Sequence, residues 1–216
     1  MSLGDKEALS SVSESESPSK RLSTSSTGEP SLFTIGYGAR TMEEFITALQ
    51  TYRIEYLIDV RSSPYSKFKL EFSREPLEAA VKAAGFRYVF MGDTIGGQPR
   101  DPDCYTDGKV DYEKVRQQGF FQKGIERLRK AYQQGIRSAL MCSEGRPEQC
   151  HRSKMIGEAL AAIGIPLHHI DEDGQSLTQT QVMDRLTGGQ LDFFGGPPLT
   201  SRKRHGPGRE ENPEPH

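Results

Sequence analysis

The sequence lacks any long hydrophobic run. No window approaches the stretch of about 18 apolar residues that a membrane helix requires, and the N-terminus has no apolar segment of the length found in signal peptides. We therefore expect a soluble, cytoplasmic protein that is not exported and has no membrane partner.

Cysteine and net charge are also scarce. The 216 residues include three cysteines, an odd number that does not form a disulfide framework and indicates a reducing compartment. The formal net charge of -2 excludes a protein whose whole surface is basic enough to coat nucleic acid or anionic lipid. A local basic pocket remains compatible with this charge.

Both ends of the chain are poor in groups that build a core. Residues 1–30 contain ten serines and no aromatic side chain, and residues 195–216 are rich in glycine, proline and basic residues. Such segments cannot bury enough apolar surface to offset the entropy of ordering, so we expect disordered tails at 1–30 and 195–216. A single folded domain then occupies residues 31–194.

Between the tails, apolar segments with high β propensity alternate with helical patterns. The expected strands are residues 32–36, 55–61, 86–92, 138–142 and 166–170, and the expected helices are residues 41–52, 75–85, 112–135, 151–164 and 178–188. Nearly continuous apolar strands separated by helices are typical of a mostly parallel sheet covered on both faces. The sequence thus predicts a three-layer, Rossmann-like α/β fold with a central sheet of about five strands flanked by helices.

Signals at the expected helix ends agree with this fold. Thr41 followed by Glu44 fits a capping box, in which each side chain accepts a hydrogen bond from a backbone N–H of the first turn. Gly85, Gly135 and Gly164 stand where helices should end before a strand, as left-handed caps often do.

The candidate site is the segment CSEGRPEQCHR at residues 142–152, which follows an expected strand and leads into an expected helix. In open parallel sheets, ligands bind beyond the carboxyl ends of the strands. The apolar stripe of the helix consists of Met155, Ile156, Ala159, Leu160 and Ile163. Extending this stripe backwards by one turn places Arg152 on the inward face at the start of the helix.

An inward-facing arginine needs an anionic partner, because an unpaired buried charge is costly. The candidates for Arg152 are Asp59, Glu144 or a bound phosphate or carboxylate. Arg61, at the end of a neighbouring strand, would add a second guanidinium, and such groups grip oxyanions with two hydrogen bonds. The two arginines are therefore interpreted as an oxyanion site or as internal ion pairs.

Three other residues of the segment carry possible chemistry. At the start of a helix the macrodipole favours a thiolate at Cys150 and a neutral imidazole at His151, which could then transfer protons. Glu144 is a further candidate acid or base, or a helix cap. Cys142 ends a strand and fits either the site or a small buried apolar position.

Spacing leaves other hypotheses open or weakens them. Cys142, Cys150 and His151, with His169, are suitable metal ligands, but their spacing matches no common zinc pattern. A disulfide between the first two is plausible as a redox response. The hypothesis of dinucleotide binding is weakened because the glycine pattern after the first strand has Thr41 in place of its third glycine. The hypothesis of a covalent phosphatase is also weakened, because neither cysteine of the segment is followed six positions later by the arginine that such an enzyme needs.

Several segments in the same order resemble the domain-of-unknown-function family numbered 488, across essentially the whole folded region. The matching segments are TIGYG, LIDVRSSPYS, YVFMGDTIGGQPRDPD, DYEKV, LMCSEGRPEQCHR and PLHHIDEDG. The resemblance implies an α/β domain with its site around Asp59, Arg61, Gly96, Gly97, Cys142, Glu144, Cys150, His151 and Arg152. Tyr37 and Gly38 depart from the family-like TIGHS.

These observations predict an enzyme that acts on a phosphate-bearing or other anionic substrate, such as a nucleotide or a nucleic-acid end. The expected catalytic residues are His151, Glu144 and Cys150, and the expected ligand-binding residues are Asp59, Arg61, Gly96, Gly97, Cys142 and Arg152. No metal ligand is assigned, and the cofactor is left open. The alternatives are a non-catalytic module that binds an anion or nucleic acid, and a Cys/His metal-site protein.

Overall fold

The computed structural model describes residues 30–188 and 199–202. The expected N-terminal tail and most of the expected C-terminal tail lie outside these residues. Four residues assigned to the C-terminal tail lie against the domain: Thr200 forms a β-bridge with Asp111, the Ser201 N–H donates to the Val110 carbonyl, and the Val110 N–H donates to the Ser201 hydroxyl.

The centre of the fold is a six-stranded sheet with the order β3-β2-β6-β1-β7-β8. Its five parallel strands are β1 (Leu32–Gly36), β2 (Tyr56–Asp59), β3 (Arg87–Phe90), β6 (Ser138–Cys142) and β7 (His168–Ile170). The sixth, β8 (Ser176–Thr178), pairs antiparallel with β7 at the edge. The predicted parallel sheet is confirmed, and β8 escaped prediction because it is short, polar and mostly exposed.

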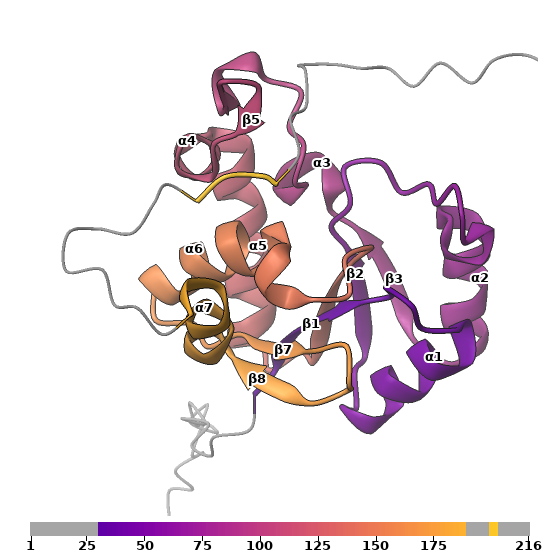
Figure 1. Ribbon diagram of the computed structural model, residues 1–216. Helices are drawn as coiled ribbons and strands as arrows, with labels where there is room; N and C mark the ends of the chain where they lie inside the picture. Colours follow the sequence, from indigo (N-terminus) through magenta and orange to yellow (C-terminus); the bar gives the residue numbers. More distant parts are fainter. Residues whose placement is uncertain (1–29, 189–198, 203–216) are drawn as a thin grey trace, which may run out of the picture.

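Helices cover both faces of the sheet, which confirms the three-layer α/β fold (Figure 1). The α-helices are α1 (Met42–Thr51), α2 (Arg74–Ala83), α3 (Gly92–Ile95), α4 (Tyr112–Gln117), α5 (Gly119–Gln133), α6 (Glu158–Ala162) and α7 (Gln179–Thr187). Shorter turns are η1 (Leu70–Phe72), η2 (Pro102–Cys104), η3 (Pro147–Gln149) and the π-helical η4 (Arg152–Gly157), and a small hairpin joins β4 (Tyr105–Thr106) to β5 (Lys109–Val110).

Alternation along the strands builds two separate cores. In β1, Phe33 and Ile35 face the layer of α1 and α2, whereas Leu32 faces the layer of α5, η4 and α6. Thr34 lies on the same face as Leu32, since side chains alternate along a strand, and it is fully buried. A polar residue at such a position needs hydrogen-bond partners.

The local signals at the helix ends are confirmed. Thr41 and Glu44 form the reciprocal capping box, with hydrogen bonds of 2.8 and 3.2 Å. Gly85, Gly135 and Gly164 have φ angles of 91°, 68° and 72°, in the left-handed region. The predicted apolar face of the helix after the candidate site was wrong at one position. Ile163 was expected to be buried but is 49% exposed, because α6 ends at Ala162.

No helix in residues 30–188 or 199–202 is long and apolar enough to cross a membrane. The cytoplasmic location stays a prediction.

Candidate functional site

The candidate site lies where three neighbouring strands end. Gly36 at the end of β1 is level with Cys142 at the end of β6, and Asp59 at the end of β2 is level with Met141. The segment after β6 turns back over the end of β1, because the N–H groups of Tyr37 and Gly38 donate hydrogen bonds to the carbonyl groups of residues 142 and 143. Polar groups from separate parts of the sequence therefore meet at one edge.

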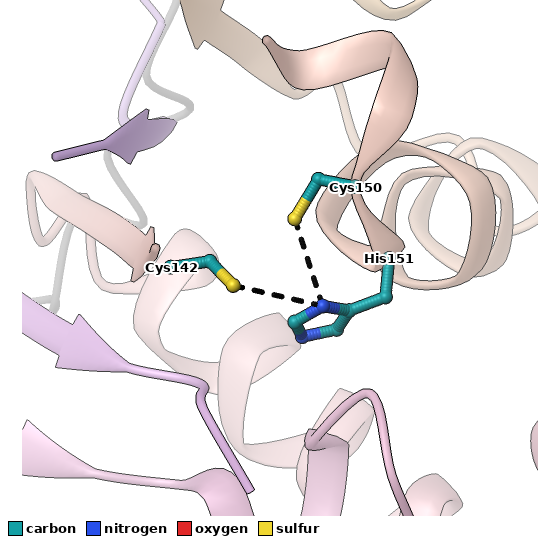
Figure 2. Close-up of side chains that lie close together, drawn as sticks. All are labelled: Cys142, Cys150 and His151. Atoms are coloured by element: carbon teal, nitrogen blue, oxygen red, sulfur yellow. Dashed lines mark hydrogen bonds between the residues drawn. The ribbon is translucent and has the colours of Figure 1, made fainter. Parts of the chain in front are cut away.

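Cys142, Cys150 and His151 form a buried group that we call the Cys–His cluster (Figure 2). Both sulfur atoms point toward Nδ1 of His151, at 3.9 Å from Cys142 and 3.6 Å from Cys150. The three ligating atoms all lie within 4.8 Å of one another. The structure thus brings together three residues of the sequence-predicted site.

The orientation of the His151 ring follows from its second nitrogen. Nε2 lies 3.1 Å from the backbone carbonyl of Val60, which can only accept a hydrogen bond. Nε2 therefore carries hydrogen, and the ring is fixed with Nδ1 facing the two sulfur atoms. Gly97 packs against this ring: a Cβ atom there would lie 2.8 Å from the imidazole.

Gly96, beside it, is a second position of close approach. A Cβ atom at Gly96 would lie 2.2 Å from the carbonyl oxygen of Gly92 and 2.4 Å from the Ser62 hydroxyl. In this structure Gly97 makes room for the His151 ring, and Gly96 makes room for the Gly92 carbonyl and Ser62. Their assignment to ligand binding stays a prediction.

Arg152 is the first residue of η4 and is fully buried, as its place in the apolar stripe indicates. Its Nε donates to the Cys150 sulfur at 3.2 Å, one terminal nitrogen to the Glu144 carbonyl oxygen at 2.5 Å, and the other to the Thr34 hydroxyl at 3.4 Å. In the part of the chain that the structure describes, no carboxylate forms a salt bridge with this guanidinium. The Cys150 sulfur is the ionisable group that accepts a hydrogen bond from it.

The charges around the cluster give the two thiols opposite acidities. The hydrogen bond to Cys150 raises the pKa of Cys142 well above its ordinary value, and burial adds to this. Burial alone raises the pKa of Cys150, but the hydrogen bond from Cys142 and the charge of Arg152 outweigh it and hold that pKa well below its ordinary value. Of the two thiols, Cys150 is therefore the stronger acid.

Arg61 is paired with Asp59 in a buried ion pair. Two guanidinium nitrogens donate to the two carboxylate oxygens at 2.9 and 2.5 Å, and a third donates to the Phe72 carbonyl oxygen at 2.7 Å. The Tyr88 hydroxyl donates to the same carboxylate at 2.8 Å. Burial and the charge of Asp59 raise the pKa of Tyr88. Arg61, which was expected to bind a substrate, therefore has Asp59 as a partner inside the protein.

Glu144 differs from these residues because its side chain is 29% exposed. Its carboxylate pairs with Arg202, from the four C-terminal residues that lie against the domain, and Arg202 also donates to Gln149. The Glu144 carboxylate is thus more accessible than the side chains of Asp59, Arg61 and Arg152, which are buried.

A separate series of hydrogen-bonded side chains starts at Thr34. Two of its members, Thr34 and Gln179, were not predicted from the sequence. Thr34 lies 2.9 Å from Nδ1 of His169, whose Nε2 lies 2.8 Å from Oε1 of Gln179. The amide nitrogen of Gln179 donates to Ser153 and Glu158, so its oxygen must accept from His169. Thr34 could have been found as the single polar residue inside an apolar strand, whereas no signal singled out Gln179.

These bonds fix the protonation state of His169. Nε2 donates to Gln179 and Nδ1 accepts from Thr34, whose oxygen already accepts from Arg152. Burial, the largest cause, lowers the pKa of His169 from 6.5 to about 3. His169 is therefore held neutral by this chain and is not part of the Cys–His cluster, contrary to its suggested place in a metal site.

Acid should destabilise the fold through His169. Between pH 6.5 and about 3 the unfolded chain binds a proton that the folded chain excludes, so stability falls as the pH falls through this window. The contribution of His169 to this loss should be about 2 kcal/mol at pH 5. Urea unfolding at pH 7 and pH 5 measures this loss. The variant His169→Gln should lose less stability than the wild type on acidification. The control variant His168→Gln should lose nearly as much stability as the wild type. Equal losses in all three proteins would refute this.

A family model for a domain of unknown function, DUF488, matches residues 41–160, which are 120 of the 216 residues. The chain belongs to the DUF488 family. The DUF488 match spans α1 to α6 and includes the Cys–His cluster, Arg152 and the Asp59–Arg61 pair, but it ends before His169 and Gln179. No curated protein and no solved structure matches the chain.

Proposed function

We propose that the protein is an enzyme that acts on a phosphate-bearing or other anionic substrate at the carboxyl edge of its sheet. The observation that supports this is an excess of buried positive charge beside the Cys–His cluster. Arg152 is 0% exposed and Lys154 is 4% exposed, and neither forms a salt bridge with a carboxylate among the described residues. Cys150, the more acidic of the two thiols, can offset one of these charges, and an anionic substrate would offset the other.

Lys154 supports this reasoning most directly. Its ammonium donates to the Thr200 carbonyl oxygen at 3.2 Å and lies 5.7 Å from the centre of the Tyr112 ring, both neutral partners. Burial lowers the pKa of Lys154, whereas its electrostatic interaction with Cys150 opposes the change. A buried cation with so little compensation would gain from an anion bound nearby.

Glu144 is the residue we assign to proton transfer. Both ring nitrogens of His151 already face protein groups, whereas the Glu144 carboxylate is partly exposed at the strand ends. Cys150 and His151 then contribute the charge and the shape of the site around the substrate. Nucleotides and nucleic-acid ends are the phosphate-bearing compounds to test first.

The test is a panel of nucleotides, sugar phosphates and inorganic phosphate, with calorimetry for binding and mass spectrometry for products. At least one compound should bind and be converted. Lys154→Met should weaken binding about tenfold or more, since a hydrogen bond to a charged group contributes roughly 1.5–3 kcal/mol. The matched control, Lys123→Met, removes an exposed lysine of α5 and should bind as the wild type does.

Glu144→Gln separates the remaining hypotheses. It should keep the affinity and lose turnover, because it removes the proton-transfer group and leaves the buried cations in place. Binding by the wild type without any product would favour the non-catalytic module. A panel without any binding compound would contradict both.

A further inference from the structure

We propose that the Cys–His cluster is a binding site for a divalent metal ion of the zinc type, with three protein ligands and one position open. This inference stands on the geometry of Cys142, Cys150 and His151. It concerns the same edge of the sheet as the proposed activity, but it can succeed or fail independently of whether a phosphate compound binds.

The spacing of the ligating atoms is the first argument. Metal–sulfur bonds of about 2.3 Å and metal–nitrogen bonds of about 2.0 Å at tetrahedral angles place neighbouring ligand atoms about 3.5–3.8 Å apart. The observed distances from the His151 Nδ1 to the two sulfur atoms are 3.6 and 3.9 Å. All three atoms lie within 4.8 Å of one another, so an ion could bind after small side-chain movements.

The groups behind the ligands are the second argument. Metal-binding histidines usually donate the hydrogen of their other nitrogen to a carbonyl or carboxylate, which fixes the ring. Nε2 of His151 does this to the Val60 carbonyl oxygen and leaves Nδ1 toward the sulfur atoms. On the other side, Arg152 donates to the Cys150 sulfur at 3.2 Å, which stabilises the thiolate that a metal requires.

The number of ligands indicates the type of site. Across residues 30–188 and 199–202, these three side chains form the one group of ligating residues close enough to share an ion. Structural zinc sites have four protein ligands, whereas catalytic sites have three and bind water or substrate in the fourth position. Both cysteines bind the ion as thiolates, with their protons released to solvent, and the two thiolates balance the two positive charges of the ion.

A disulfide between Cys142 and Cys150 is the rival use of the same atoms. It would need an oxidant such as a peroxide, which takes two electrons and two protons from the thiols and leaves as water. A disulfide does not require an imidazole beside it, yet Nδ1 of His151 faces both sulfur atoms and contacts each (Figure 2). This arrangement favours the metal.

The experiment uses the full chain, reduced and stripped with a chelator, then titrated with Zn²⁺ against a chromophoric competitor. We expect one tightly bound ion per chain. Cys142→Ser, Cys150→Ser and His151→Gln should each weaken binding about 100-fold or more, beyond the 10–100-fold typical of losing a group behind the ligands. Cys104→Ser is the matched control, because Cys104 is the third buried free cysteine and lies outside the cluster.

A second measurement needs no variant and therefore does not depend on whether the variants fold. Co²⁺ added to the wild type should give the sulfur-to-cobalt charge-transfer band and the intense visible bands of a tetrahedral thiolate site. Less than about a tenth of an ion per chain, or cobalt spectra without these bands, would overturn the proposal. So would equal affinity in all four variants, which would mean adventitious binding, or a chain that takes up no metal when reduced and forms the disulfide in peroxide.

Discussion

Replacing Asp59 with alanine is expected to lower the free energy of unfolding by about 3–5 kcal/mol, the range for breaking one side of a buried ion pair. Asp59 is 0% exposed and accepts two hydrogen bonds from Arg61, which is 5% exposed. Without the carboxylate, the buried guanidinium keeps the neutral Phe72 carbonyl and the Tyr37 ring as partners, and the Tyr88 hydroxyl loses its acceptor. Urea unfolding followed by circular dichroism measures the change.

Two controls distinguish the effect of breaking a buried ion pair from the effect of removing any charged side chain. Glu126→Ala breaks the exposed pair with Arg129 and should cost far less stability than Asp59→Ala, because solvent screens exposed ion pairs. The double variant Asp59→Ala with Arg61→Met removes both charges and should recover part of the loss, because no unpaired cation remains. If Asp59→Ala and Glu126→Ala cost the same, the buried pair is not a major source of stability.

Most of the fold could be predicted from the sequence because its signals are local. Four of the five parallel strands are mostly apolar runs of four or five residues, and the capping box of α1 and the glycines that end three helices depend on residues close in sequence. The edge strand β8 has no such signal, since a short polar strand is defined by its partner β7. Likewise, nothing in residues 199–202 indicates that they pair with the segment near Val110.

The candidate site was predictable in its residues and not in its pairings. Cys142, Cys150, His151 and Arg152 are close in sequence, so one segment brings them together. Their partners come from other parts of the sheet: Val60 follows β2 and Thr34 belongs to β1, and Thr34 in turn bonds to His169 of β7. These contacts depend on the strand order, and a backbone carbonyl such as that of Val60 has no signature in the sequence.

The same reasoning explains why Arg61 and Arg152 could not be assigned from sequence alone. A guanidinium at a strand end can bind a ligand or a neighbouring group, and the choice depends on whether an acceptor lies within about 3 Å. Arg61 has such an acceptor two residues away in Asp59, and Arg152 has the Glu144 carbonyl. The inward direction of Arg152 followed from helical periodicity, but the identity of its acceptors did not.

Gly36→Ala is the second substitution with a large expected effect, and it should destabilise the protein by about 3 kcal/mol or more, at the upper end of the costs of overpacking. A Cβ atom on Gly36 would lie 1.8 Å from the Glu144 carbonyl oxygen and 2.9 Å from an Arg152 nitrogen. The carbonyl oxygen belongs to the backbone and cannot rotate away. The loop would therefore move, and the contact between Arg152 and the Glu144 carbonyl would break.

The effect of Gly36→Ala also distinguishes two explanations for the glycines at the end of β1. In a dinucleotide site they would make room for a pyrophosphate, whereas here Gly36 makes room for the segment that carries Glu144. Gly119→Ala is the matched control, because nothing lies within 4 Å of a Cβ atom there and its φ is not in the left-handed region. Thermal and urea unfolding should find Gly119→Ala close to the wild type. Should Gly36→Ala unfold at the same urea concentration as that control, the close approach between β1 and the Glu144 segment is not required for the fold.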